Sequence, residues 1–157
     1  MEIRKFIETD GAKIKELILS ILEKEYPFDR KAYSDTDLET IAATYGGSRD
    51  TFFVIEKEGQ IIATAGIKED SREVALLRRV FVSPAERRKG YGSKLLGKTV
   101  TFCEENGYKE MVFRATSKMV QAIELCKKSG FKEAEKLDLG GFFIHKFVLN
   151  LKLISQA

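Results

Sequence analysis

The sequence contains no tryptophan, only two prolines, two cysteines and one histidine in 157 residues. Cys103 and Cys126 lie 23 positions apart and form no CxxC pair, so we expect neither a disulfide framework nor a structural metal site. No apolar run approaches the roughly 20 residues that span a bilayer. The opening residues, MEIRKFIETDG, contain acids and no apolar segment of the kind found in secretory signals. These absences predict a cytoplasmic protein without a metal and without a membrane partner.

The composition is that of a folded protein, with 43 % apolar and 32 % charged residues. A chain of this length buries about 68–70 % of the surface that its unfolded form exposes, which is enough for a core without disulfides or metals. Domains cluster at roughly 100–150 residues. We therefore expect residues 1–157 to form a single domain. Its oligomeric state is left open, a homodimer included.

The formal net charge of +3 conceals an uneven distribution. Residues 1–50 hold 8 basic and 11 acidic side chains, a balance of −3, whereas residues 78–98 hold 7 basic side chains and one acidic, a balance of +6. Most charge runs are solvated faces, but this basic run surrounds a glycine-containing turn, as an anion site would require. Nucleic acid is a weaker alternative, because no aromatic-interleaved basic strand or long basic helix accompanies the run.

Apolar periodicity and turn residues predict a mixed α/β fold with the element order βααβββαβαββ. The first helix is expected to be capped by Thr9 or Asp10 and to end at Tyr26, and the second to start near Ser34 or Asp35 and stop at Gly46-Gly47. The remaining strands and helices are predicted at 1–7, 51–56, 61–67, 74–82, 92–105, 111–115, 118–128, 131–136 and 142–151. Strands 74–82 and 111–115 flank one crossover helix and should be parallel. Two predicted hairpins, across Glu58-Gly59 and Gly140-Gly141, make the rest of the sheet largely antiparallel.

The segment most informative about function is Arg87–Lys94 (RRKGYGSK), which follows a strand and opens a helix. A helix N-terminus offers unpaired backbone amides and partial positive charge to a phosphate. Gly90 and Gly92 allow close approach of the backbone, and the neighbouring basic side chains add charge-assisted contacts. The glycines alone would also suit a simple strand-to-helix turn. A P-loop string is absent, and the dinucleotide fingerprint lacks its third glycine.

Val80–Pro84 (VFVSP), followed by Arg87-x-x-Gly90-x-Gly92, resembles the acetyl-CoA motif of the GCN5-related N-acetyltransferase (GNAT) superfamily. Downstream, the pattern from Thr116 to Leu125 and the pair Gly130-Phe131 resemble the motif that precedes the last strands of that superfamily. The element order agrees along nearly the whole chain, although the specific motifs cover only residues 74–131.

The resemblance implies a single-domain GNAT-like fold in which strands 74–82 and 111–115 splay apart around acetyl-CoA. The Val82 amide would polarise the thioester carbonyl, and the amine would attack directly, without an acyl-enzyme. Together with the basic run, this gives the expected cofactor-binding set Val80, Phe81, Val82, Arg87, Arg88, Lys89, Gly90, Tyr91, Gly92 and Ser93.

Two positions depart from the superfamily pattern. Many members have a tyrosine four residues before the Gly-Phe pair, where this chain has Cys126. Cys126 is the candidate proton donor to the leaving thiolate, with a small buried hydrophobe as the alternative. Some members have a glutamate where this chain has Leu76. The base could be water or one of Glu73, Glu23 and Glu25, although these glutamates are more typical of solvated faces.

The sequence therefore predicts an N-acetyltransferase that acts on a primary amine of a small molecule or peptide, with a non-catalytic acyl-CoA-binding module as the alternative. The acidic first third and the aromatics Tyr26, Phe28, Tyr33 and Tyr45 would suit a cationic acceptor, although core packing explains at least half of them. His145 lies on an apolar strand face and is expected to be a packing residue, with a catalytic base as the weaker alternative.

Overall fold

The computed structural model describes residues 1–27 and 36–152. Seven strands form one mixed sheet in the order β1-β2-β3-β4-β5-β7-β6, in which only β4 and β5 pair in parallel. The predicted α/β class, element order and parallel pair are confirmed. The strands are β1 (Glu2–Lys5), β2 (Thr51–Lys57), β3 (Gln60–Glu69), β4 (Val74–Val82), β5 (Glu110–Thr116), β6 (Lys132–Asp138) and β7 (Phe143–Asn150), and the α-helices are α1 (Gly11–Glu25), α2 (Ile41–Thr44), α3 (Tyr91–Glu105) and α4 (Val120–Lys128).

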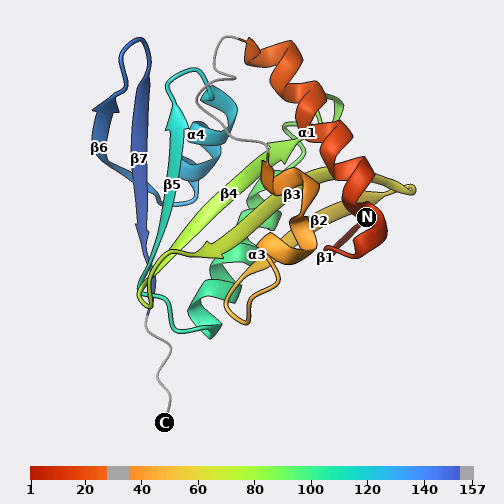
Figure 1. Ribbon diagram of the computed structural model, residues 1–157, viewed down its shortest axis with the longest axis horizontal. Coiled ribbons are helices and arrows are strands. Elements are labelled where there is room, and N and C mark those ends of the chain that lie inside the picture. The colour runs from red at the N-terminus through yellow and green to blue at the C-terminus, as the bar shows by residue number, and fades with distance from the viewer. Residues whose placement is uncertain (28–35, 153–157) are drawn as a thin grey trace.

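Helices cover both faces of the sheet. Figure 1 shows α1 and α2 in front of the central strands, and α3 and α4 behind them. Strands β2 and β3 are accordingly buried on both faces and form nearly continuous apolar runs. β6, at the edge of the sheet, is exposed along its whole length. No described helix has both the length and the apolarity of a membrane span.

The parallel pair separates partway along its length. β4 pairs with β5 from Val74–Glu110 to Leu77–Phe113. Beyond this point the two strands no longer pair with each other, although β4 still pairs with β3 and β5 with β7. The divergence coincides with a β-bulge in β4, where the register against β3 shifts between Thr64 and Gly66. A bulge adds a residue to one strand and bends it. The expected splay of these two strands is therefore present.

Arg79 is the bulged residue, with a left-handed φ of 56° that a non-glycine side chain seldom adopts. Two contacts hold it there. The Thr64 hydroxyl donates a hydrogen bond of 2.7 Å to the Arg79 carbonyl, and the Arg79 guanidinium forms a buried ion pair with Asp37. Asp37 also accepts a hydrogen bond of 2.7 Å from the Tyr45 hydroxyl. The segment between α1 and β2 thus stabilises the bend in β4.

That segment corrects the prediction of one regular second helix. Its predicted start, Ser34 or Asp35, lies outside the described residues. The described part is a 3-10 turn at Thr36–Glu39 followed by the short α2, because Thr40 between them leaves the helical region (φ −136°, ψ 45°). Asp37 lies within the 3-10 turn and bonds to β4, so the tertiary contact determines the local geometry.

The predicted capping of α1 is also corrected. Asp10 occupies the position before Gly11, but its carboxylate makes no capping bond to the helix. The carboxylate instead accepts hydrogen bonds from the Arg4 guanidinium at 2.7 and 3.0 Å and from the Ile7 amide at 3.0 Å. The hydrogen bond from Arg4 lowers the pKa of Asp10. Asp10 therefore joins β1 to the start of α1, and Thr9 lies in a preceding 3-10 turn.

Candidate functional site

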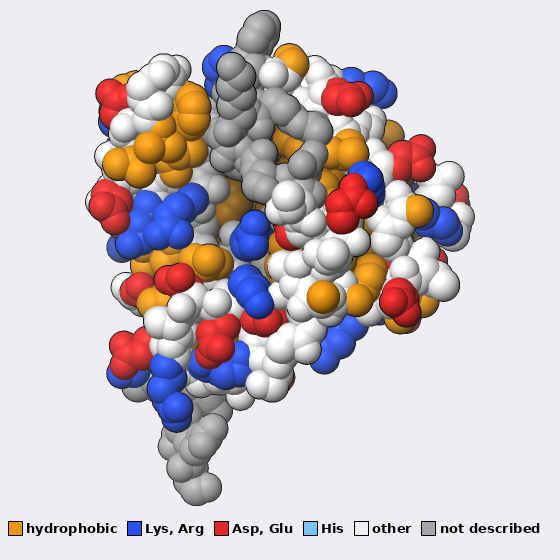
Figure 2. Space-filling view, viewed as in Figure 1, with side chains coloured by type: hydrophobic (Ala, Val, Ile, Leu, Met, Phe, Trp, Pro, Cys, Tyr) orange, Lys and Arg blue, Asp and Glu red, His pale blue; other side chains and the backbone are white. Residues whose placement is uncertain are grey.

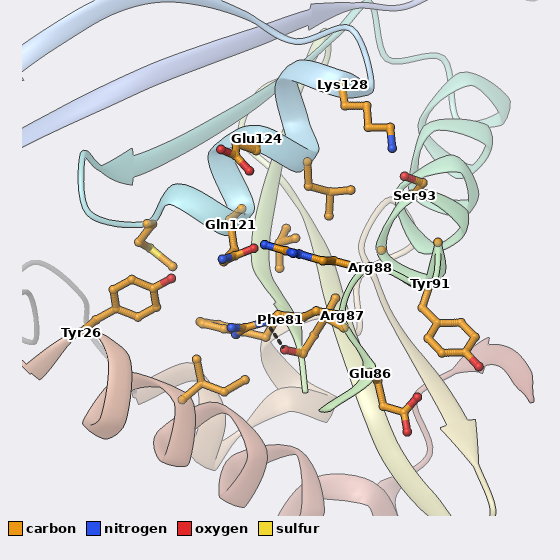
Figure 3. A pocket seen from close by; sticks show the side chains of 18 residues that line it. Tyr26, Phe81, Glu86, Arg87, Arg88, Tyr91, Ser93, Gln121, Glu124 and Lys128 are labelled. Atoms are coloured by element: carbon orange, nitrogen blue, oxygen red, sulfur yellow. Dashed lines mark hydrogen bonds between the residues drawn. The ribbon is translucent and has the colours of Figure 1, made fainter. Parts of the chain in front are cut away.

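The splayed end of β4 opens into a cavity of about 370 Å³. Its walls come from the C-terminal ends of α1 and β4, the turn before α3, and one face of α4 (Figure 3). Nine of the ten predicted cofactor-binding residues line it: Val80, Phe81, Val82, Arg87, Arg88, Gly90, Tyr91, Gly92 and Ser93. Lys89 does not; its ammonium lies 3.1 Å from Glu86 instead.

The turn before α3 presents a run of free backbone donors. Among the described residues, none of the amides from Arg88 to Ser93 has a hydrogen-bond acceptor, and intrahelical bonding begins with Lys94 donating to Gly90 at 3.2 Å. Arg88 and Gly90 adopt left-handed φ values of 64° and 83°, which turn the chain from β4 into the helix. Figure 3 shows the Arg88 side chain extending into the cavity toward Gln121. Free amides and a guanidinium at a helix N-terminus are groups that suit an anion.

Gly92 packs closely against the side chain of Leu125. A Cβ at this position would lie 2.8 Å from Leu125 Cδ2, and 3.5 Å from Val82 Cγ2. Its missing side chain therefore allows α3, α4 and the end of β4 to meet at one point. The sequence motif predicted a close approach by a ligand at this glycine; the structure adds a close approach between elements that line the cavity.

The edge of β4 at Val82 is open toward the cavity. The amide of Ser83 donates to Ile62 of β3 at 2.7 Å, so the neighbouring Val82 amide points to the opposite edge, where β5 has diverged. The Val82 carbonyl points the same way and accepts a hydrogen bond of 3.1 Å from Arg87 Nε. Val82 N–H is thus placed to donate to a group held in the cavity.

Arg87 connects two walls of the site. Its guanidinium nitrogens lie 2.8 and 2.9 Å from the two carboxylate oxygens of Glu25 at the end of α1. Together with the bond to Val82, this bidentate ion pair occupies the guanidinium. Arg87 therefore holds α1 against the end of β4, and Glu25, one of the predicted bases, is its partner.

Helix α4 forms one wall of the cavity and contributes residues that were not predicted to belong to the site. Gln121, Glu124 and Lys128 line the cavity together with Met119, Ala122 and Leu125 from the predicted downstream motif. Gln121, Leu125 and Lys128 have the spacing of one helical face, which is the signal that could have identified them. Lys128 adds positive charge opposite Ser93 (Figure 3).

A second cavity, of about 230 Å³, lies between the separated parts of β4 and β5. Val80, Phe81 and Met119 line both cavities, so the two meet at these side chains. Leu76, found where some GNAT members have glutamate, lines the second cavity. No described carboxylate or imidazole lines this second cavity, whose ionisable lining residues are Arg78, Arg79 and Arg114.

The other candidates for acid–base chemistry lie elsewhere. Glu73 forms an exposed ion pair with Lys109 at 2.9 Å, and Glu23 is exposed on α1; neither lines the two cavities. His145 Nδ1 lies 2.8 Å from Glu133 Oε2, and its ring stacks on Phe147. The hydrogen bond from His145 lowers the pKa of Glu133. His145 therefore has the environment of a packed, hydrogen-bonded residue.

Cys126 is fully buried behind the α4 wall and is absent from the cavity lining. Burial raises the pKa of its thiol to about 12. Tyr26, by contrast, lines the first cavity and directs its hydroxyl into it (Figure 3). Of the two roles that the sequence left open for Cys126, these observations favour the buried hydrophobe.

The comparison with protein families matches residues 15–131 to the acetyltransferase (GNAT) family. The chain belongs to this family. Among curated proteins, this GNAT chain is 29 % identical over 145 residues to N-acetyltransferase family 8 member 3 of Rattus norvegicus, a match that covers 87 % of this chain and 61 % of the relative. The chain thus spans about three fifths of the length of the curated relatives that it matches first.

Solved structures share the fold along almost the whole chain. A GNAT-family acetyltransferase from Staphylococcus aureus Mu50 superposes with a TM-score of 0.81 at 26 % identity, covering 96 % of this chain and 99 % of that one. The protein yncA from Salmonella typhimurium, solved with its cofactor acetyl-CoA, superposes with a TM-score of 0.75 at 22 % identity, covering 96 % and 94 %. These likenesses agree with the GNAT-like fold inferred from the sequence.

Proposed function

We propose that this chain is an acetyl-CoA-dependent N-acetyltransferase that acetylates a primary amine of a small molecule or peptide. The observation that supports this most strongly is the cavity at the splayed end of β4, where the free amides before α3 and the open edge of Val82 face the same space. Membership of the GNAT family supports the same reaction class. That yncA was solved with acetyl-CoA supports this coenzyme as the acetyl donor.

The residues of the first cavity suit the parts of coenzyme A. The amides from Arg88 to Ser93 would bind the pyrophosphate, with Arg88 and Lys128 adding charge. The open β4 edge offers its amides and carbonyls to the pantetheine arm, as a neighbouring strand would. Val80, Phe81 and Met119 then surround the place where the thioester would pass from the first cavity to the second.

The chemistry is a direct acyl transfer. The neutral amine nitrogen attacks the acetyl carbonyl carbon, a C–N bond forms, and the C–S bond breaks with its electron pair going to sulfur. The Val82 amide donates to the oxygen that becomes negative, and a donor of this kind contributes about 2.7–4 kcal/mol to transition-state stabilisation. The amine releases a proton to water, and the coenzyme thiolate takes one up.

Cys126 is expected to be a packing residue in this reaction. Proton transfer to the coenzyme thiolate from a thiol whose pKa burial raises to about 12 is uphill. We expect Cys126→Ala to leave kcat at saturating acetyl-CoA within about two-fold of wild type, with an unchanged pH–rate profile, while lowering the free energy of unfolding by about 1–2 kcal/mol. Steady-state kinetics over pH 6–10 and urea unfolding measure both quantities.

Cys103→Ala is the matched control, because Cys103 is an equally buried cysteine in α3, with a pKa that burial also raises to about 12. A ten-fold fall in kcat together with a shifted pH–rate profile, seen for Cys126→Ala and not for Cys103→Ala, would restore Cys126 as the proton donor.

One observation favours a non-catalytic acyl-CoA-binding module: the second cavity has no described carboxylate or imidazole that could act as a base. A thiol-release assay with acetyl-CoA and a broad amine panel distinguishes the two functions. We expect turnover above the uncatalysed rate with at least one amine. Calorimetric binding of acetyl-CoA without turnover would favour the binding module, and no heat at millimolar acetyl-CoA would remove both functions.

A further inference from the structure

The second cavity has a distinctive charge that the acetyl-transfer reaction does not require. Among the described residues, its ionisable lining consists of three guanidinium groups, those of Arg78, Arg79 and Arg114. Asp37 neutralises Arg79 in the buried ion pair at the bulge. The acidic first third of the sequence suggested a cationic acceptor, whereas the charged side chains that the structure describes at this cavity are all positive.

Among the described residues that line the second cavity, Arg78 and Arg114 are the two arginines whose side chains have no carboxylate at hydrogen-bond distance. Arg78 forms its ion pair within the described part of the chain with Asp37, at 3.9 Å, and Arg79 and Tyr45 already bind this carboxylate at shorter range. Arg114 is exposed and has no ion-pair partner among the described residues. Guanidinium groups that line a cavity without a carboxylate at hydrogen-bond distance suit a bidentate contact with a ligand carboxylate.

Strand register places Arg114 on the side of the sheet where α1 and α2 lie. Phe113 pairs with Phe147, whose ring contacts Lys127 of α4, so these side chains face α4. The next pair, Arg114 and Lys146, therefore faces the opposite side. Lys146 is paired with Glu135 at 3.2 Å. Figure 2, seen from the side of α1 and α2, shows Lys and Arg side chains gathered over β5 and β7 and beside the adjacent hollow.

We propose that the acceptor amine also carries a carboxylate, as amino acids do, and that Arg78 and Arg114 bind this carboxylate. The proposal rests on the acetyltransferase function above and names its substrate class. The carboxylate would anchor the acceptor at the arginines while its amine points toward Val80, Phe81 and Met119, where the two cavities meet. Fixed positive charges near an amine also disfavour its ammonium form, which increases the neutral fraction that attacks.

Matched pairs of acceptors test the substrate class, because decarboxylation removes only the anchoring group. Wild-type enzyme is assayed by thiol release with L-phenylalanine against 2-phenylethylamine, L-histidine against histamine, and L-ornithine against putrescine. We expect the carboxylated member to have a kcat/KM at least ten-fold higher in each pair that is turned over. Equal values, or a preference for the decarboxylated amines, would overturn the proposal and leave the acetyltransferase function standing. No turnover of any amine would overturn both.

Arg114→Gln and Arg78→Gln test the residues. Losing one charge-assisted contact should raise KM for the carboxylated acceptor about 10- to 100-fold, with little change in kcat or in KM for the decarboxylated amine. Arg72→Gln, a change at an exposed arginine outside both cavities, is the control and should have no effect. Because Arg78 lies near the buried Asp37, Arg114→Gln gives the cleaner result. Unchanged KM for the carboxylated acceptor in both variants would contradict the proposed role.

Discussion

Replacing Gly92 with glutamate is expected to weaken coenzyme A binding by about 100-fold or more. Two effects act together. The new side chain would push Leu125 out of the cavity wall, since a Cβ alone would lie 2.8 Å from Leu125 Cδ2. The carboxylate would also place negative charge beside the free amides of Arg88–Ser93, where the pyrophosphate is proposed to bind. Isothermal titration calorimetry with CoA measures the change in Kd.

Two further variants make the Gly92 result specific. Gly92→Ala adds bulk without charge and should weaken binding by a smaller factor than glutamate. Gly97→Ala, in the same helix, places a methyl group where nothing lies within 4 Å, so it should leave Kd unchanged and stabilise α3 by about 0.5–1 kcal/mol. Wild-type affinity in a folded Gly92→Glu protein would contradict the proposed anion site.

Removing the carboxylate of Asp37 is expected to cause the largest loss of stability among these variants. Asp37→Ala should lower the free energy of unfolding by about 3–5 kcal/mol, the usual result when one partner of a buried ion pair is removed. Arg79 would keep a buried charge and a left-handed backbone without the bonds that hold them, and the Tyr45 hydroxyl would lose its acceptor. Urea unfolding followed by circular dichroism measures the loss.

The same substitution should also affect the site, because the Arg79 bulge accompanies the separation of β4 from β5. We expect weaker acetyl-CoA binding under conditions where Asp37→Ala remains folded. Glu73→Ala, which breaks the exposed pair with Lys109, is the control and should have a much smaller effect on stability. An Asp37→Ala protein as stable as that control would show that the buried pair does not hold the bend.

Asp37 also makes stability depend on pH. Burial, the largest single influence, raises the pKa of this carboxyl, but the hydrogen bonds from Arg79 and Tyr45 and the positive charges of Arg79 and Arg78 together hold the pKa below its ordinary value. The stabilisation is therefore complete above the unfolded-state pKa of about 3.9 and is lost as pH falls through the lower folded-state value. Asp37→Asn should flatten the fall in unfolding free energy below about pH 4. Asp10, whose pKa Arg4 lowers, will keep part of the slope.

The parts of the fold and site that the sequence predicted are those encoded locally. Strand, turn and helix follow each other within residues 74–105, so the motif around Gly90 and Gly92 could be placed at a helix N-terminus without knowledge of the tertiary structure. The hairpin turn at Glu58-Gly59, which has positive φ at both residues, could likewise be predicted from its own two residues. Nine of the ten predicted cofactor-binding residues line one cavity for this reason.

The missed features depend on contacts between distant segments. Asp37 lies 42 positions before Arg79, and Glu25 lies 62 positions before Arg87. In each pair the carboxylate binds the guanidinium, so that the arginine joins two segments of the fold. No local pattern indicates that Arg79 adopts a left-handed bulge, or that Arg114 approaches the same cavity as Arg78. The burial of Cys126 likewise follows from how α4 packs, and its sequence position alone left two roles open.

A crystal structure of the protein with coenzyme A bound tests the central claim most directly. The account predicts diphosphate oxygens within about 3.2 Å of amide nitrogens in the Arg88–Ser93 turn, with the thiol end near Val82. A coenzyme bound in another cavity, with these amides making no contact to it, would contradict the account.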